Sequence, residues 1–144
     1  MDYSASFAIS AAGMGFERSR ADVSAMNLAN MHVSAASPSE LYRPLRVVAA
    51  PQGTRDLLFR NLVLQGLPET PVALVEPMET APRKVLEPGH PHADARGTVS
   101  YPGVNLLHET VTGLTAQRAY EANVAAFNAS KTMVLKALEI GRGT

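Results

Sequence analysis

The chain has 144 residues, and thirteen Lys plus Arg balance thirteen Asp plus Glu, so its formal net charge is zero. Nucleic-acid binding usually requires an excess of positive charge to neutralise the phosphates, and the chain lacks such an excess. This argues against a nucleic-acid-binding function. It has no cysteine, which excludes disulfides and thiolate metal sites, and its length suits one small domain with extensions.

The start of the chain carries no targeting signal of the Sec type. Met1-Asp2-Tyr3 is not a basic n-region, and no apolar core follows it. No stretch approaches the ~18 consecutive apolar residues of a membrane span. We therefore expect neither a cleaved signal peptide nor direct membrane insertion.

The prolines divide the chain. All ten fall between Pro38 and Pro102, and proline interrupts helices. We predict an N-terminal helical axial segment over residues 1–37, a Pro-rich β and loop domain over 38–102, and a long C-terminal helix within 103–144. The fold class is α+β, with the long terminal helices in an antiparallel or intersubunit coiled-coil-like core and a small irregular β domain between them.

The first helix is predicted from about Tyr3 to Met31, where apolar residues recur at helical period. Gly13 and Gly15 weaken it by about 1 kcal/mol each relative to Ala, so we expect it to form only when packed. The residues predicted to pack against other helices are Phe7, Ile9, Met14, Phe16, Val23, Met26 and Leu28.

The second helix is predicted from Asn105 to Arg142. At 1.5 Å per residue it would run roughly 55–60 Å, longer than the ~30–35 Å across a compact domain of this size. Apolar residues on more than one face indicate more than one partner helix. The predicted packing residues are Leu107, Val111, Leu114, Tyr120, Val124, Phe127, Val134, Leu138 and Ile140.

The middle segment is predicted to form strands in small sheets, because its prolines exclude a central strand. The candidates are Leu45–Ala50, Leu57–Leu64 and Val72–Val75, with weaker signals at Val85–Leu86 and Thr98–Tyr101. Leu57–Leu64 could equally be a short helix, since periodicity does not decide so short an apolar run.

Four asparagines lie within or beside the apolar stripes: Asn27, Asn30, Asn123 and Asn128. They could be surface residues, or buried amides that set the register between helices, as polar residues do in coiled coils. The sequence leaves both interpretations open, and we include Asn27, Asn30 and Asn123 among the packing residues.

His90, His92 and Asp94 form the one metal-like cluster. Pro91 restricts the backbone between the imidazoles, and no further His or Cys motif completes a ligand set. We interpret the cluster as a loop, with a small metal-dependent enzyme as the alternative. No catalytic residue and no cofactor site is predicted.

Several motifs resemble the family of flagellar rod and hook axial proteins, and most closely the proximal rod subunits of that family. They are Ala8–Asn30 with its Asn-Leu-Ala-Asn run, Glu87–Pro91, Tyr101–Asn105, Ala116–Asn123 and Lys136–Arg142. The chain departs from the family at Glu109–Leu114, where a Met-rich element is usual.

The resemblance implies a structural subunit of the basal-body rod in the periplasm. Such subunits are exported by the flagellar type III apparatus without a cleaved signal peptide. Their termini, disordered before assembly, become helices that pack with copies of the chain and with other rod proteins, and so transmit torque. The alternatives are another flagellar axial protein, or a self-contained cytoplasmic helical dimerisation module.

Overall fold

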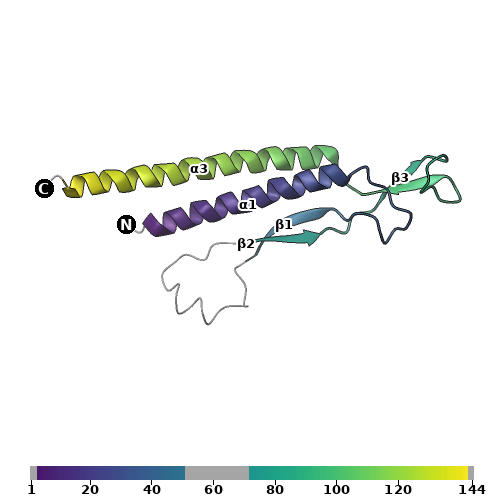
Figure 1. The fold of residues 1–144 in the computed structure, drawn as a ribbon, viewed down its shortest axis with the longest axis horizontal. Helices are drawn as coiled ribbons and strands as arrows, with labels where there is room; N and C mark the ends of the chain where they lie inside the picture. Colours follow the sequence, from purple (N-terminus) through teal and green to yellow (C-terminus); the bar gives the residue numbers. More distant parts are fainter. Residues whose placement is uncertain (1–2, 51–71, 143–144) are drawn as a thin grey trace, which may run out of the picture. The chain divides into compact units, whose positions relative to one another are not determined.

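The computed structural model describes residues 3–50 and 72–142. The elements follow the order α1 (Tyr3–Asn30), β1 (Leu45–Ala50), β2 (Val72–Pro77), β3 (Arg83–Leu86), β4 (Thr98–Tyr101) and α3 (Leu106–Arg142). One long helix thus precedes the small β region along the chain and another follows it (Figure 1), and the predicted α+β class is confirmed. The candidate strand at Leu57–Leu64 lies outside the described residues.

The β region consists of two separate two-stranded sheets, β1–β2 and β3–β4. β3 and β4 are antiparallel, with Arg83 opposite Tyr101 and Leu86 opposite Thr98. Val85 therefore faces Val99, whose side chain is fully buried. The small sheets are those that the proline density predicted, and β2 runs two residues further than expected.

The chain divides into two compact units, and both helices contribute to each. Unit 1 contains residues 1–19, 48–74 and 115–144, and unit 2 contains residues 20–47 and 75–114. The predicted segments 1–37, 38–102 and 103–144 are continuous stretches of sequence, whereas each of these units combines several stretches. The division into those three segments stays a prediction.

In unit 1, the first half of α1 packs against the second half of α3 in antiparallel orientation. The rings of Phe7 and Phe127 lie 4.8 Å apart between centroids, and the hydroxyls of Ser6 and Ser130 are 2.7 Å apart. A Cβ on Gly13 would lie 2.6 Å from Oδ1 of Asn123. Gly13 is thus a close-approach position between the helices, where the sequence indicated only a weakened helix.

In unit 2, the turn before α3 is packed against the segment that precedes β3. Tyr101 and Pro102 are buried, and a Cβ on Gly103 would overlap the carbonyl oxygen of Ala81. Asn105 then caps α3, because its Oδ1 accepts the backbone N–H of His108 at 3.1 Å. The motif Tyr101–Asn105 therefore fixes where the second helix starts.

Replacing Gly103 by alanine tests this packing. The added methyl must displace the backbone of Ala81, and overpacking of this kind typically costs about 1–3 kcal/mol. We expect urea unfolding, followed by circular dichroism, to show that loss. Gly89→Ala is the matched control, because a Cβ there meets nothing within 4 Å. Equal stability of the two variants would contradict the close approach.

Candidate functional site

The most deeply buried polar side chain on α1 is Asn27, whose exposed fraction is 0%. It lies in unit 2, in the Asn-Leu-Ala-Asn run of the sequence. Because a buried amide without partners is costly, its hydrogen bonds decide what the position does.

The amide of Asn27 bonds the backbone of β1 at both of its ends. Nδ2 donates to the carbonyl oxygen of Leu45 at 2.8 Å, and Oδ1 accepts the N–H of Leu45 at 2.9 Å. Oδ1 also accepts the hydroxyl of Tyr42 at 2.8 Å. The side chain thus pairs with Leu45 as a neighbouring strand would, and it attaches β1 to the helix.

The same amide reaches α3 through Glu109, which is only 6% exposed. Nδ2 of Asn27 donates to Oε1 of Glu109 at 3.0 Å. The Ser24 hydroxyl lies 2.5 Å from the carbonyl oxygen of Glu109 and 2.9 Å from its Oε2, so its proton serves both acceptors. Neutral donors on α1 therefore solvate a buried carboxylate, and such charge-assisted bonds offset part of its desolvation.

We call Ser24, Asn27, Tyr42, Leu45 and Glu109 the Asn27 network. It joins α1, the segment before β1, β1 itself and α3 within unit 2. The buried position of Asn27 and its bond to α3 agree with the register-setting interpretation, which stays a prediction. Asn30 and Asn123 instead bond carbonyl oxygens of their own helices, those of Met26 and Ala119.

The predicted metal-like cluster is part of the β3–β4 connection. The backbone N–H of His92 donates to Nδ1 of His90 at 3.0 Å, and Nδ1 of His92 lies 3.0 Å from the Ser34 hydroxyl. Oδ1 of Asp94 accepts the N–H groups of Thr98 and Arg96, which in that order lower the pKa of its carboxyl. Within residues 3–50 and 72–142, no three His, Asp or Glu side chains are grouped to hold a metal ion.

Tyr101, the last residue of β4, contacts the β3–β4 connection. The hydroxyl of Tyr101 donates to Oε2 of Glu87 at 2.8 Å, and its ring contacts His90 edge-on and the guanidinium of Arg83. The hydrogen bond to Glu87, followed by burial, raises the pKa of Tyr101. The Glu87–Pro91 motif is thus explained by packing on Tyr101.

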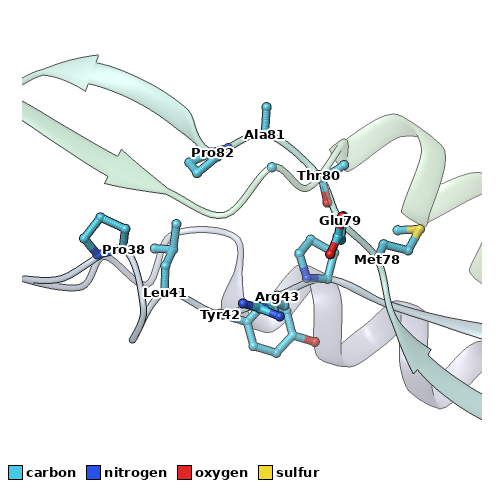
Figure 2. A pocket seen from close by; sticks show the side chains of 11 residues that line it. Pro38, Leu41, Tyr42, Arg43, Met78, Glu79, Thr80, Ala81 and Pro82 are labelled. Atoms are coloured by element: carbon cyan, nitrogen blue, oxygen red, sulfur yellow. The ribbon is translucent and has the colours of Figure 1, made fainter.

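A shallow cleft of about 320 Å³ lies in unit 2, between residues 38–44 and 78–82 (Figure 2). Prolines stand on both sides of it, and its charged lining residues are Arg43 and Glu79. Its lining holds one carboxylate, that of Glu79, and no histidine.

The predicted packing residues fall into three groups by exposure. Val23 and Asn27 are buried. The half-buried residues include the pair Phe7 and Phe127, which contact each other in unit 1; the others are Met14, Phe16, Leu28, Asn30, Asn123, Val124 and Val134. The exposed residues are Ile9, Met26, Leu107, Val111, Leu114, Tyr120, Leu138 and Ile140.

Sequence reasoning missed Ser24, Tyr42 and Glu109 as members of a site. Glu109 was one acidic residue among scattered ones, and Ser24 was one small residue among many on α1. The available signal was that Glu109 occupies the first turn of α3, where an acidic side chain is favourable. Its pairing with Asn27 depends on contacts between residues 82 positions apart.

Comparison with known proteins gives a consistent family. Residues 95–140 match the model of the flagellar basal body rod FlgEFG protein C-terminal family. The chain is 33% identical to the flagellar basal-body rod protein FlgC of Salmonella typhimurium over 141 residues, covering 94% of this chain and 96% of that protein. The FlgC proteins of Bacillus subtilis and Borreliella burgdorferi are 34% and 32% identical, each over more than nine-tenths of both chains.

The matched region and the paired terminal helices define a flagellar axial protein. The chain belongs to the family of flagellar basal-body rod proteins FlgC. It is accordingly a structural subunit of the bacterial flagellar basal-body rod. Neither described helix combines the length and hydropathy of a membrane span.

Asn27→Asp tests the Asn27 network. The substitution keeps the shape but removes both donated bonds and places a second carboxylate beside Glu109. Uncompensated buried charges cost about 3–5 kcal/mol, so we expect a loss of that order in the free energy of unfolding at neutral pH. The loss should shrink as the pH falls, because burial beside Glu109 raises the pKa of the new carboxyl. Asn128→Asp, at an exposed position, is the control, and an equal loss there would contradict the network.

Tyr42 gives a test at alkaline pH. Burial, and then the negative charge of Glu109, raises the pKa of Tyr42 above its usual value of 10.0. The folded state therefore holds the hydroxyl proton of Tyr42 more tightly than the unfolded state does. The stability that this proton contributes is fully present below pH 10.0, and it is lost as the pH rises through the pKa of Tyr42 in the folded state. Tyr42→Phe should therefore weaken the dependence of unfolding free energy on pH between about 9 and 12. Tyr120→Phe, at an exposed ring, should leave it as in the wild type.

Proposed function

We propose that the chain assembles into the rod through the exposed apolar residues of α1 and α3, against copies of itself and other rod proteins. The observation that carries the proposal is the exposure of large apolar side chains on α1 and α3. Monomeric soluble proteins rarely leave contiguous apolar patches uncovered, and larger ones mark interaction sites.

Unit 2 contributes one such patch. Leu107, Val111 and Leu114 follow one another at helical spacing on α3, and Leu107 is 73% exposed. The residues of α3 that face α1 in this unit lie on another side of the helix, where Glu109 meets Ser24 and Asn27. The patch is thus separate from the surface that the chain's own α1 uses.

Unit 1 contributes a second set, on the last turns of α3. Met133, Leu135, Leu138 and Ile140 are exposed, and the exposed fraction of Ile140 is 77%. Phe127, on the same helix, contacts Phe7 instead. We therefore divide the predicted packing residues into those that hold α1 to α3 and those that meet other subunits.

The export and assembly steps of the proposal are taken from the family to which the chain belongs. We propose that the flagellar type III apparatus exports the chain to the periplasm, and that its terminal segments order on assembly. In the assembled rod, the many apolar contacts between packed helices then transmit torque from subunit to subunit, and no cofactor is needed. The absence of a cysteine from the chain suits a route on which no disulfide has to form.

Leu107→Asp tests the assembly surface. A carboxylate on an exposed position should change the free energy of unfolding by no more than about 0.5 kcal/mol. Buried in a subunit interface it would be an unpaired charge, so we expect the variant to be absent from purified basal bodies and cells that carry it to be non-motile. Immunoblots of basal bodies and of export culture supernatants provide the measurement.

Leu106→Asp is the matched control for this experiment. Leu106 is 56% exposed on the first turn of α3, and it lies three or four residues from none of Leu107, Val111 and Leu114, so it is outside the patch. The control adds the same charge to the same helix and should be incorporated. Normal incorporation of Leu107→Asp would overturn the assignment of this surface.

A further inference from the structure

The outer edge of β4, in unit 2, is occupied by the chain itself. The N–H of Thr98 donates to Oδ1 of Asp94 at 2.8 Å, and the carbonyl oxygen of Thr98 accepts the N–H of Asp94 at 3.0 Å. Both backbone groups of Thr98 are thus used on the side of β4 that faces away from β3. A further strand that approached this edge would find Asp94 in its place.

The outer edge of β3, in contrast, is open. The N–H of Glu87 donates to the carbonyl oxygen of Gly97 at 2.8 Å, in step with the β3–β4 register, so Val85 also belongs to a hydrogen-bonded pair. Because successive residues of a strand direct their backbone groups to alternate sides, those of Lys84 and Leu86 point away from β4. In the part of the chain that the structure describes, β3 pairs with β4 alone. Lys84 and Leu86 therefore form an unpaired edge, and the side chains of both are exposed.

An open edge of this sequence is largely complementary to the same edge of a second copy. In an antiparallel pair centred on Val85, Lys84 comes opposite Leu86 of the second copy, so the unpaired backbone groups of both chains meet as hydrogen-bonded pairs. Arg83 then comes opposite Glu87 of the second copy, and opposite charges at facing positions are favourable. Backbone, apolar side chains and this charge pair therefore all favour the contact, and Lys84 is the residue that does not.

Lys84 opposes pairing in the registers that the open edge allows. In the pair centred on Val85, the Lys84 side chains of the two copies lie on one face as diagonal neighbours about 7–8 Å apart, and their like charges repel. A pair centred on Lys84 would place the two ammonium groups directly opposite each other. A pair centred on Leu86 would place Lys84 opposite Pro88, which has no N–H to donate. Each of these three registers therefore carries a penalty, and in the first two it comes from Lys84.

We propose that Lys84 prevents two copies of the chain from pairing through their β3 strands. A lysine on an exposed edge strand is one of the means by which proteins avoid pairing edge to edge. A contact between two β3 strands is two-fold, so it would close at two copies instead of extending. Such pairs would withdraw chains from a larger assembly, a consequence that rests on the proposed function.

Disulfide formation in the purified full chain tests this role. Val85→Cys supplies a single thiol, because the chain has no cysteine of its own. In the pair centred on residue 85, the two Cα atoms would lie about 4.5 Å apart, within the ~4.4–6.8 Å that a disulfide spans. Adding Lys84→Val should raise the initial rate of dimer formation roughly tenfold, because it removes the repulsion and gives each copy an apolar contact with Leu86. Non-reducing gels of samples taken during mild oxidation provide the measurement.

Four further variants, each in the Val85→Cys chain, show whether charge and edge are responsible. Lys84→Arg keeps the charge, and Arg96→Val removes an exposed positive charge outside β3, so both should leave the rate unchanged. Leu86→Pro, added to Lys84→Val, removes an N–H from the edge and should abolish the increase. Lys84→Glu should not link to itself, but it should link to the chain that retains Lys84, because opposite charges then become diagonal neighbours.

Sedimentation velocity of the Lys84 variants without the engineered thiol gives a second measure of dimer formation. Equal rates for Lys84→Val and Lys84→Arg would overturn the proposal, and so would an increase that Leu86→Pro leaves intact. Both measurements use the purified chain, so neither result depends on incorporation into the rod. Failure of the proposed function would instead appear as normal incorporation of Leu107→Asp into basal bodies.

Discussion

The arrangement of unit 2 depends on one buried amide. Asn27 is in contact with α3 through Glu109 and with β1 through both backbone groups of Leu45, so a single side chain sets the position of a strand and of a second helix. Its geometry leaves little freedom, because every donor or acceptor that lost its partner would be buried and unsatisfied. In the described residues, no buried side-chain nitrogen or oxygen lacks a hydrogen bond.

This polar junction explains why a small apolar core suffices in unit 2. Besides Val23, Leu41, Val99 and Tyr101, few large apolar side chains of this unit are buried. Hydrogen bonds replace the specificity that a larger core would provide, and the apolar residues of α3 remain available on the surface. In the assembly proposed above, neighbouring subunits would bind these exposed residues without competing with the chain's own fold.

The motifs shared with the rod family acquire physical meanings from the structure. Asn27 of the Asn-Leu-Ala-Asn run bonds a strand, Gly103 of the Tyr101–Asn105 motif admits the backbone of Ala81, and Glu87 holds the hydroxyl of Tyr101. None of these roles involves a reaction. They position helices, which agrees with membership of a family of structural subunits.

The sequence by itself determined the elements: proline positions separated two helices from a β region, and helical period located both helices to within a residue. These features are local, so they can be read from neighbouring residues. Only the tertiary structure decided that Asn27 and Gly13 are contact points, that Phe7 meets Phe127, and that Glu109 is buried. Those outcomes depend on which faces of two helices, far apart in the sequence, meet in the fold. The period of the apolar residues identifies a face on each helix but does not identify the face that packs against it.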